Sequence, residues 1–472
     1  MDPTTENFKT NVRKAIADNN LSIALSKLSE GFPAQRSKAV NRLPEFEDLR
    51  DQAREIKEHV LKNLDFYLEQ FESRVLESGG KVHWCRSAAE ARSTILRISR
   101  AVGAKTVTKS KSMIGEEISI NEHLEQHGIE PVETDLGEYI IQLRNEKPSH
   151  IIAPAIHLTM KQVANTFRKK HLHLASERSL NEPRELLEEA RDELRQKFLC
   201  ADVGLTGANM LIAETGSIVL VTNEGNADLT YSLPKTHIAI ASLEKIVPTL
   251  EDASTILRVL ARSATGQDMS VYTTFCTGPK RSDDLDGPEN FHIVIIDNGR
   301  SNMLGGEFND MLMCIRCGAC LNHCPVYKVI GGHAYGWVYS GPMGATLIPN
   351  LIGIDKSHHL AQASTLCGKC EEVCPMRIQL PRMLRSWRQL YFERHRVTSI
   401  GRQLLKIWSF LATWPSLYRF VFSIMIAALV SISRKRGRFK KMPFFSKWTK
   451  NFDLPVPEGG TFIDRWNRGE QL

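Results

Sequence analysis

The chain has 472 residues, of which 42% are hydrophobic and 24% are charged, and its net charge is +7. This length predicts two or three domains. The ordinary composition excludes a mainly disordered, collagen-like or polytopic membrane protein. Ten cysteines are too few for a disulfide scaffold, and the first residues contain no apolar stretch typical of a secretory signal. We therefore expect a cytoplasmic protein whose clustered cysteines bind metal or carry out redox chemistry.

The first 79 residues are predicted to be helical, because apolar residues recur at helical spacing up to Gly79. Between residues 80 and 300, strand-like and helical stretches alternate, which is typical of βαβ units and a parallel sheet. The expected strands are 81–84, 105–108, 130–134, 150–153 and 291–296, with a β-rich stretch at 201–223; the expected helices are 88–102, 115–126, 159–169 and 183–200. An α/β domain is therefore expected over 80–300.

Residues 301–385 are expected to form a separate domain that holds most of the cysteines. Its first motif is C-x2-C-x2-C-x3-C-P, formed by Cys314, Cys317, Cys320, Cys324 and Pro325. This is the bacterial ferredoxin run, in which three thiolates hold one iron–sulfur cluster and the fourth reaches the other. The spacing therefore predicts ferredoxin-type clusters. A zinc site with four cysteine ligands is the competing metal hypothesis.

The second motif lacks its first thiol. Cys367, Cys370 and Cys374 keep the spacing and the following proline, but Ser364 stands where the first cysteine belongs. Crossed ligation predicts cluster 1 on Cys314, Cys317, Cys320 and Cys374, and cluster 2 on the remaining three thiols, Cys324, Cys367 and Cys370. Cluster 1 is then a 4Fe–4S cluster. Cluster 2 is either 3Fe–4S or 4Fe–4S, its fourth iron held by Ser364, water, substrate or another residue.

Several further stretches carry a resemblance to a known family. They are KSKSM at 109–113, ETDLGEY at 133–139, PSH at 148–150, AETGS at 213–217, NEGN at 223–226 and GGHAYGWVYSGP at 331–342. Together with the cysteine motifs, they resemble the lactate-utilisation iron–sulfur protein family (LutB, also called LldF). The resemblance covers residues 15 to 470.

The resemblance implies a lactate-utilisation (LUD) α/β domain, related in fold to sugar-phosphate isomerases and CoA transferases, joined to an α-helical ferredoxin-type domain. It implies action with a LutA-type CCG-domain protein and a LutC-type LUD protein. The expected function is electron transfer in a complex that oxidises L-lactate to pyruvate, an L-lactate dehydrogenase system, with a membrane electron carrier as acceptor. The alternative is a redox-sensing or ligand-binding LUD module with structural clusters. Removing a hydride also requires a flavin, a nicotinamide or another centre, and the sequence assigns no residues to one.

The α/β domain offers four catalytic candidates. Glu214 and Ser217 flank a turn that could bind an anion through backbone N–H groups. Lys109 and Lys111 follow an expected strand end, where open α/β sheets bind ligands. Each also has a plain structural explanation, as a tight turn or a polar loop. Weaker candidates are Asn223, Asn226, Asp135, Glu138 and His150.

The C-terminal region, 386–472, is expected to be helical and basic. Its apolar core, residues 420–432, is shorter than the ~20 residues that a bilayer requires. Six basic residues follow between Arg434 and Lys441. These features favour peripheral contact with an anionic membrane surface, and a helix that docks on a partner is the alternative. Nothing else favours a nucleic-acid partner, so we expect none.

Overall fold

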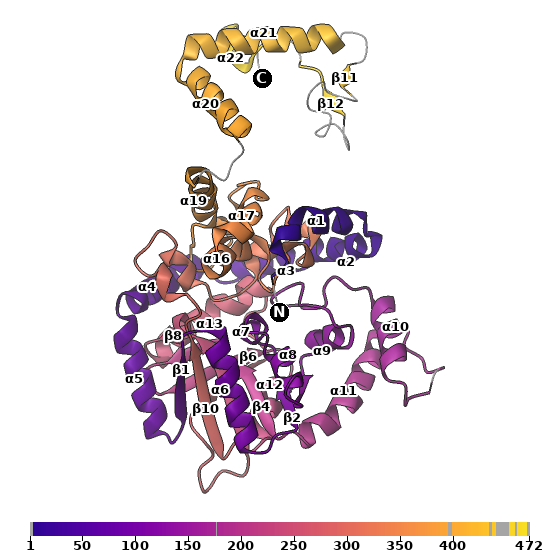
Figure 1. Cartoon of the computed structure of the whole chain (residues 1–472), viewed down its shortest axis with the longest axis vertical. Coiled ribbons are helices and arrows are strands. Elements are labelled where there is room, and N and C mark those ends of the chain that lie inside the picture. Colours follow the sequence, from indigo (N-terminus) through magenta and orange to yellow (C-terminus); the bar gives the residue numbers. More distant parts are fainter. Residues whose placement is uncertain are drawn as a thin grey trace. The chain divides into compact units, whose positions relative to one another are not determined.

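The computed structural model describes residues 3–175, 177–394, 399–433, 437–439, 453–457 and 460–469. The chain divides into two compact units, Met1–Tyr391 and Phe392–Leu472 (Figure 1). The first unit contains all the cysteines.

The first unit begins with a layer of helices. After a short 3₁₀ turn (Thr5–Asn7), the helices are α1 (Phe8–Ala17), α2 (Asn19–Glu30), α3 (Phe32–Asn41), α4 (Phe46–Lys62) and α5 (Leu64–Glu77). The apolar side of α4 is buried through Leu49, Ala53 and Val60, which follow helical spacing. This confirms the helical character expected of the segment, with a break at Asn63 between α4 and α5.

A six-stranded parallel sheet follows. Its order is β1 (Lys81–Cys85), β10 (Asn290–Ile296), β7 (Thr236–Ser242), β4 (Val203–Gly207), β2 (Thr106–Lys109) and β3 (Glu130–Glu133). Successive residues of a strand point to opposite faces of the sheet. Both faces are buried, as is usual for a parallel sheet. In β7, Ile238 and Ile240 pack in one apolar cluster, while Ala239 and Ala241 pack in another.

Helices cover each face of this sheet. The Ile238 face packs against α6 (Ala88–Ala101), α7 (Met113–Glu117) and α8 (Ile120–Glu125). The Ala239 face packs against α5, α12 (Asn226–Ser232) and a smaller sheet. Beyond β3 lie α9 (Leu136–Leu143), α10 (Met160–Lys170) and α11 (Pro183–Leu199), which share a core with Val132. The expected α/β fold with a parallel sheet is confirmed.

The smaller sheet has the order β8 (Ile246–Val247), β5 (Met210–Ile212), β6 (Ser217–Thr222) and β9 (Tyr272–Cys276). Strands β5 and β6 form an antiparallel hairpin. Gly216 in its turn has a φ of +69°, and a Cβ there would lie 2.6 Å from the backbone nitrogen of Val75. The turn therefore requires glycine. Helix α13 (Leu250–Ala264) follows β8.

The cysteine region consists of short helices around its loops. These are three 3₁₀ turns (Ser301–Met303, Asn309–Met313 and His333–Tyr335) and the helices α14 (Ala319–Asn322), α15 (Tyr327–Ile330), α16 (Gly341–Ile352), α17 (Ile354–Gln362), α18 (Lys369–Glu372) and α19 (Leu380–Glu393). Arginines of the N-terminal helices bind its backbone. Arg50 Nη2 donates to the Cys374 carbonyl at 2.7 Å, and Arg36 Nη2 donates to the Val373 carbonyl at 3.2 Å.

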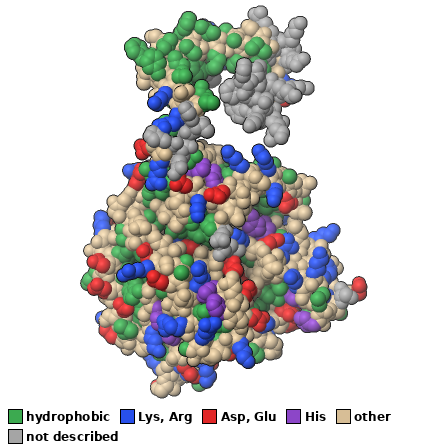
Figure 2. Space-filling view, viewed as in Figure 1, with side chains coloured by type: hydrophobic (Ala, Val, Ile, Leu, Met, Phe, Trp, Pro, Cys, Tyr) green, Lys and Arg blue, Asp and Glu red, His purple; other side chains and the backbone are tan. Residues whose placement is uncertain are grey.

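The second unit contains α20 (Ser399–Thr413), α21 (Pro415–Ser433) and α22 (Phe462–Asn467), with a two-stranded pairing of β11 (Arg438–Phe439) and β12 (Leu454–Pro455). Figure 2 shows apolar side chains gathered over α20 and α21. Residues 415–432 have a mean hydropathy of 1.7 and are long and apolar enough to cross a membrane by length and composition. The expectation that the apolar run is too short is therefore wrong on length, because the helix extends back through Arg419 to Pro415. Of the basic residues in this region, 434–436, 440 and 441 lie outside the described residues.

One expected strand is wrong. Residues 150–153 form a loop, not a strand. The apolar side chains there are buried against the cysteine region: Ile151 belongs to the core that also holds Cys320. The His150 ring nitrogen Nε2 lies 3.0 Å from the Asn322 side chain. Packing against the cysteine region, rather than pairing with a neighbouring strand, explains why residues 151–153 are apolar.

Candidate iron–sulfur centre and adjoining cavity

The first cysteine motif wraps around a small apolar cavity. Cys314, Cys317 and Cys320 line it together with Cys374, which comes from the second motif. The other lining residues are mostly apolar: Ile151, Met311, Ile315, Met343, Pro375, Met376, Ile378 and Leu380, with Arg316 and Gly318. The structure therefore brings together the four thiols that crossed ligation assigns to cluster 1.

The second motif repeats the backbone of the first at an offset of fifty residues. Arg316 and Gly318 have φ values of 61° and 74°, and their counterparts Leu366 and Gly368 have φ values of 54° and 84°. Helices α14 and α18 begin at equivalent positions, Ala319 and Lys369. The last thiol of each motif also accepts a backbone hydrogen bond from a residue three or four positions further on. The Tyr327 nitrogen donates to Cys324 at 3.5 Å, and the Ile378 nitrogen donates to Cys374 at 3.4 Å.

The remaining three thiols form a second group. Burial, followed by the neighbouring thiols of Cys324 and Cys367, raises the pKa of Cys370 to about 12. Cys367 itself is exposed, whereas Cys324 and Cys370 are buried. Ser364 occupies the position equivalent to Cys314. It is half-buried, and its hydroxyl accepts a hydrogen bond from the Leu366 nitrogen at 3.1 Å.

The chemistry of these thiols fits iron–sulfur clusters. Burial and the neighbouring thiols raise the pKa of Cys320 well above its ordinary value, and burial raises the pKa of Cys374 to about 11. Without a cation, such closely packed thiols stay protonated. A bound metal reverses this preference and favours the thiolate. A sulfur-only donor set in an apolar pocket suits an iron–sulfur cluster.

A larger cavity lies beside the first motif, at the carboxyl ends of the parallel strands. Its volume is about 460 Å³, within the ~300–1,000 Å³ usual for small-molecule sites. The walls come from segments that follow β2, β3, β4 and β7, and from Arg316 and Tyr339 of the cysteine region. Sequence reasoning predicted ligand binding at strand ends, but it missed Lys245, Arg316 and Tyr339. Arg316 could have been found from its place inside the first cysteine motif.

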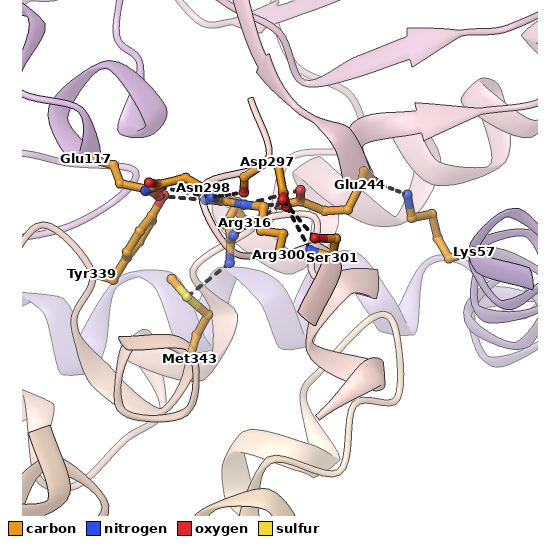
Figure 3. Close-up of polar contacts among 10 residues, drawn as sticks. All are labelled: Lys57, Glu117, Glu244, Asp297, Asn298, Arg300, Ser301, Arg316, Tyr339 and Met343. Carbon is orange, nitrogen blue, oxygen red and sulfur yellow. Dashed lines mark hydrogen bonds and ion pairs between the residues drawn. The ribbon is translucent and has the colours of Figure 1, made fainter. Parts of the chain in front are cut away.

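A buried polar network connects the cavity wall to the cysteine loop (Figure 3). Arg300 Nη2 lies 2.6 Å from Glu117 Oε2, and Arg300 Nε lies 3.3 Å from Glu244 Oε2. Glu244 also pairs with Arg316 at 3.4 Å, and the Arg316 guanidinium lies 5.1 Å from the Tyr339 ring centre. Burial alone would raise the pKa of Glu244, but Arg300 and Arg316 lower it to about 2. The network therefore holds Arg316 in place between the two cavities.

The four catalytic candidates separate in the structure. Lys111 lines the larger cavity and pairs with Asp135 at 3.2 Å. Lys109 is enclosed in the core, 2.8 Å from Glu116 and 2.7 Å from Glu133. Glu214 and Ser217 lie at the turn of the β5–β6 hairpin, whereas the other end of β6, at Thr222, reaches the cavity. The structure therefore does not bring Glu214, Ser217 or Lys109 to the cavity.

The weaker candidates also divide. Asn223, Asn226 and Asp135 line the cavity. Glu138 is buried beside Glu116 and Glu133, within reach of the Lys109 charge. His150 packs in the core, and burial lowers its pKa to about 4. A neutral histidine with an amide partner, Asn322, explains that residue structurally.

Comparison with known proteins agrees with this architecture. The LUD domain model matches residues 68–296, and the 4Fe-4S dicluster domain model matches residues 310–378. The fold and the paired cysteine motifs thus define an iron–sulfur protein built on a LUD domain.

Full-length relatives give the family. Lactate utilization protein B of Lysinibacillus sphaericus is 42% identical over 98% of this chain and 97% of its own length. The proteins of that name from Bacillus subtilis and Anoxybacillus flavithermus are 43% and 44% identical, each over 98% of this chain and over 96% and 97% of their own lengths. The chain belongs to the lactate utilization protein B family, which confirms the family predicted from the sequence.

Proposed function

We propose that this protein is an iron–sulfur electron-transfer subunit of a complex that oxidises L-lactate to pyruvate. The grouping of seven cysteines into two sets of thiols, the first of them beside the larger cavity, carries the proposal. The name of its relatives, lactate utilization protein B, supports the substrate.

The proposed ligands follow the crossed pattern. Cys314, Cys317, Cys320 and Cys374 hold a 4Fe–4S cluster, and Cys324, Cys367 and Cys370 hold the second cluster, of the 3Fe–4S or 4Fe–4S type, with Ser364 as the candidate fourth ligand. When bound, such clusters accept and donate single electrons. The apolar residues around the first set shield its buried thiols, Cys317, Cys320 and Cys374, from water, whereas Cys314 is partly exposed. Exposed Cys367 gives the second set access to an electron-transfer partner at the surface.

The proposed partners are a LutA-type CCG-domain protein, a LutC-type LUD protein and a membrane electron carrier. Peripheral contact with the cytoplasmic membrane face is proposed for the second unit. In its described residues, α20, α21 and the residue that joins them expose large apolar side chains, among them Trp408, Phe410, Trp414, Phe420 and Ile424. Exposed aromatic and aliphatic side chains next to a basic segment are typical of interfacial helices.

Reduction by lactate tests the proposal. The anaerobic protein is mixed with L-lactate, with and without the two partner proteins, while the visible absorbance of the clusters is followed. We expect bleaching only when the partners are present. Clusters that stay oxidised in the complete mixture, but are reduced by dithionite, would instead support a redox-sensing or ligand-binding module with structural clusters.

A further inference from the structure

The larger cavity has two ends of different charge. Near β2 and β3, Lys111 is paired with Asp135, and Glu224 lies close by. Near β7, the cavity is lined by Lys245 and Arg316. Since β7 and β2 are separated by β4 in the sheet, these ends lie apart. The charged groups lining the cavity are thus three cations and two carboxylates.

The β7 end has unused positive charge. Its nearest carboxylate, Glu244, already binds Arg300 and Arg316, and Glu117 binds Arg300. Among the described residues, Lys245 forms no ion pair within 4.0 Å. Its side chain is half-buried, and burial, followed by the charge of Arg316, lowers its pKa to about 8. A half-buried lysine beside an arginine favours an anion between them.

The cavity also has an apolar lining that suits a short carbon skeleton. Ile151, Ile152, Leu220, Leu260 and Ala261 contribute to it. Asn209 and Ser112, from the segments after β4 and β2, offer hydrogen-bonding groups in the same cavity. The cavity thus offers cationic, hydrogen-bonding and apolar lining residues. A ligand with a carboxylate, an adjacent oxygen and an apolar chain matches all three.

We infer that the cavity binds a small 2-hydroxy- or 2-oxocarboxylate, with its carboxylate on Lys245 and Arg316 beside the cluster 1 thiols. The inference rests on the proposed function for the ligand's identity, because lactate and pyruvate belong to this class. Arg316 belongs to both cavities, so the ligand lies directly next to the first set of cysteines. The volume of the cavity also admits a longer carbon chain, so a larger 2-hydroxy acid is the alternative ligand.

Binding to the isolated holoprotein tests the inference. Titration calorimetry is carried out anaerobically with L-lactate, pyruvate and 2-hydroxyhexanoate. Propane-1,2-diol, which lacks the carboxylate of lactate, and inorganic phosphate serve as comparison ligands. We expect saturable binding of at least one carboxylate and none of the diol. Tight phosphate binding without carboxylate binding would overturn the inference.

Variants locate the ligand. Lys245→Gln should weaken carboxylate binding about tenfold or more, because a charge-assisted hydrogen bond is lost, and Lys245→Arg should restore much of it. Lys235→Gln is the matched control: Lys235 is exposed at the other end of β7 and pairs with Glu289 at 3.4 Å. Retained cluster absorbance shows that each variant is folded.

A competing role for Lys245 is to balance the negative charge of cluster 1. In that case Lys245→Gln lowers the reduction potential but leaves carboxylate affinity unchanged, which would overturn the inference. If Lys245→Gln leaves lactate-driven reduction in the full complex intact but binding is lost, the cavity serves a purpose other than lactate oxidation. If lactate reduces nothing in the full complex although the cavity binds carboxylates, the proposed function fails and the site stands.

Discussion

At the scale of single residues, Lys109 shows how a predicted ligand-binding lysine becomes a structural one. Its amine is fully buried between Glu116 and Glu133, with Glu138 close by. Burial, followed by the neighbouring carboxylates Glu133 and Glu116, raises the pKa of Glu138, while Lys109 opposes the rise. Removing the lysine leaves the carboxylates without their cation.

We predict that Lys109→Met destabilises the protein by about 3–5 kcal/mol, the cost of breaking a buried ion pair. Thermal denaturation followed by circular dichroism measures the change. Lys197→Met is the control, because Lys197 forms an exposed pair with Glu130 at 2.6 Å, for which about 0–1 kcal/mol is expected. Equal effects of the two variants would contradict the structural role of Lys109.

His237 predicts a pH dependence of stability. Burial lowers its pKa from 6.5 to about 3, so the folded protein takes up its proton only at a much lower pH than the unfolded chain. This contribution to stability is present above pH 6.5 and is lost as the pH falls. His237→Gln should therefore reduce the stability loss between pH 7.5 and 5.5 by about 1.4 kcal/mol. Chemical denaturation of both proteins at pH 7.5 and 5.5 measures the difference. An equal loss of stability in the variant and the unaltered protein would contradict the prediction.

At the scale of elements, the two cysteine loops form a repeated structure with one substitution. The left-handed residues before and after Cys317 recur around Cys367, and Ser364 falls where Cys314 lies. We predict that Ser364→Cys converts a three-iron signal of cluster 2 into a four-iron signal in electron paramagnetic resonance. Thr365→Cys, which is exposed one residue away, should leave the spectrum unchanged. A response to both variants, or to neither, would contradict the equivalence of position 364.

Local pattern predicted the strands β1, β2, β3 and β10 and the helices α6, α10 and α11, because strand and helix periodicity are properties of neighbouring residues. It named no strand at β7, in the interior of the sheet. It failed at residues 150–153, where Ile151 packs against the cysteine region. Local pattern also could not show which end of the β5–β6 hairpin reaches the cavity. Only the fold decides that Thr222, rather than Glu214, faces the cavity. The cysteine groups were predictable since ligand spacing is encoded locally.

At the scale of the whole molecule, the cavity depends on long-range assembly. Lys111, Lys245 and Arg316 are distant in sequence, and they line one space only because parallel strands end at one edge and the cysteine loop covers it. No local signal relates a lysine after β7 to an arginine within a cysteine motif. The sequence alone therefore predicted the region of this site but not its cationic end.

The second unit gives a prediction on membrane attachment. Deleting residues 404–441 should release the protein from membranes and leave both clusters intact, because all cysteines lie in the first unit. High salt should also release the intact protein, since each basic residue near an anionic surface contributes about 1 kcal/mol that salt screens. Cell fractionation measures both. Release of the intact protein by detergent alone would instead identify α21 as a membrane span.

The metal content of anaerobically purified protein tests the account most directly, because the proposed electron transfer depends on two iron–sulfur clusters on the seven clustered cysteines. Elemental analysis with acid-labile sulfide and electron paramagnetic resonance is the measurement. We predict about seven or eight irons per chain in two clusters. Near-stoichiometric zinc with little iron or sulfide would contradict the assignment.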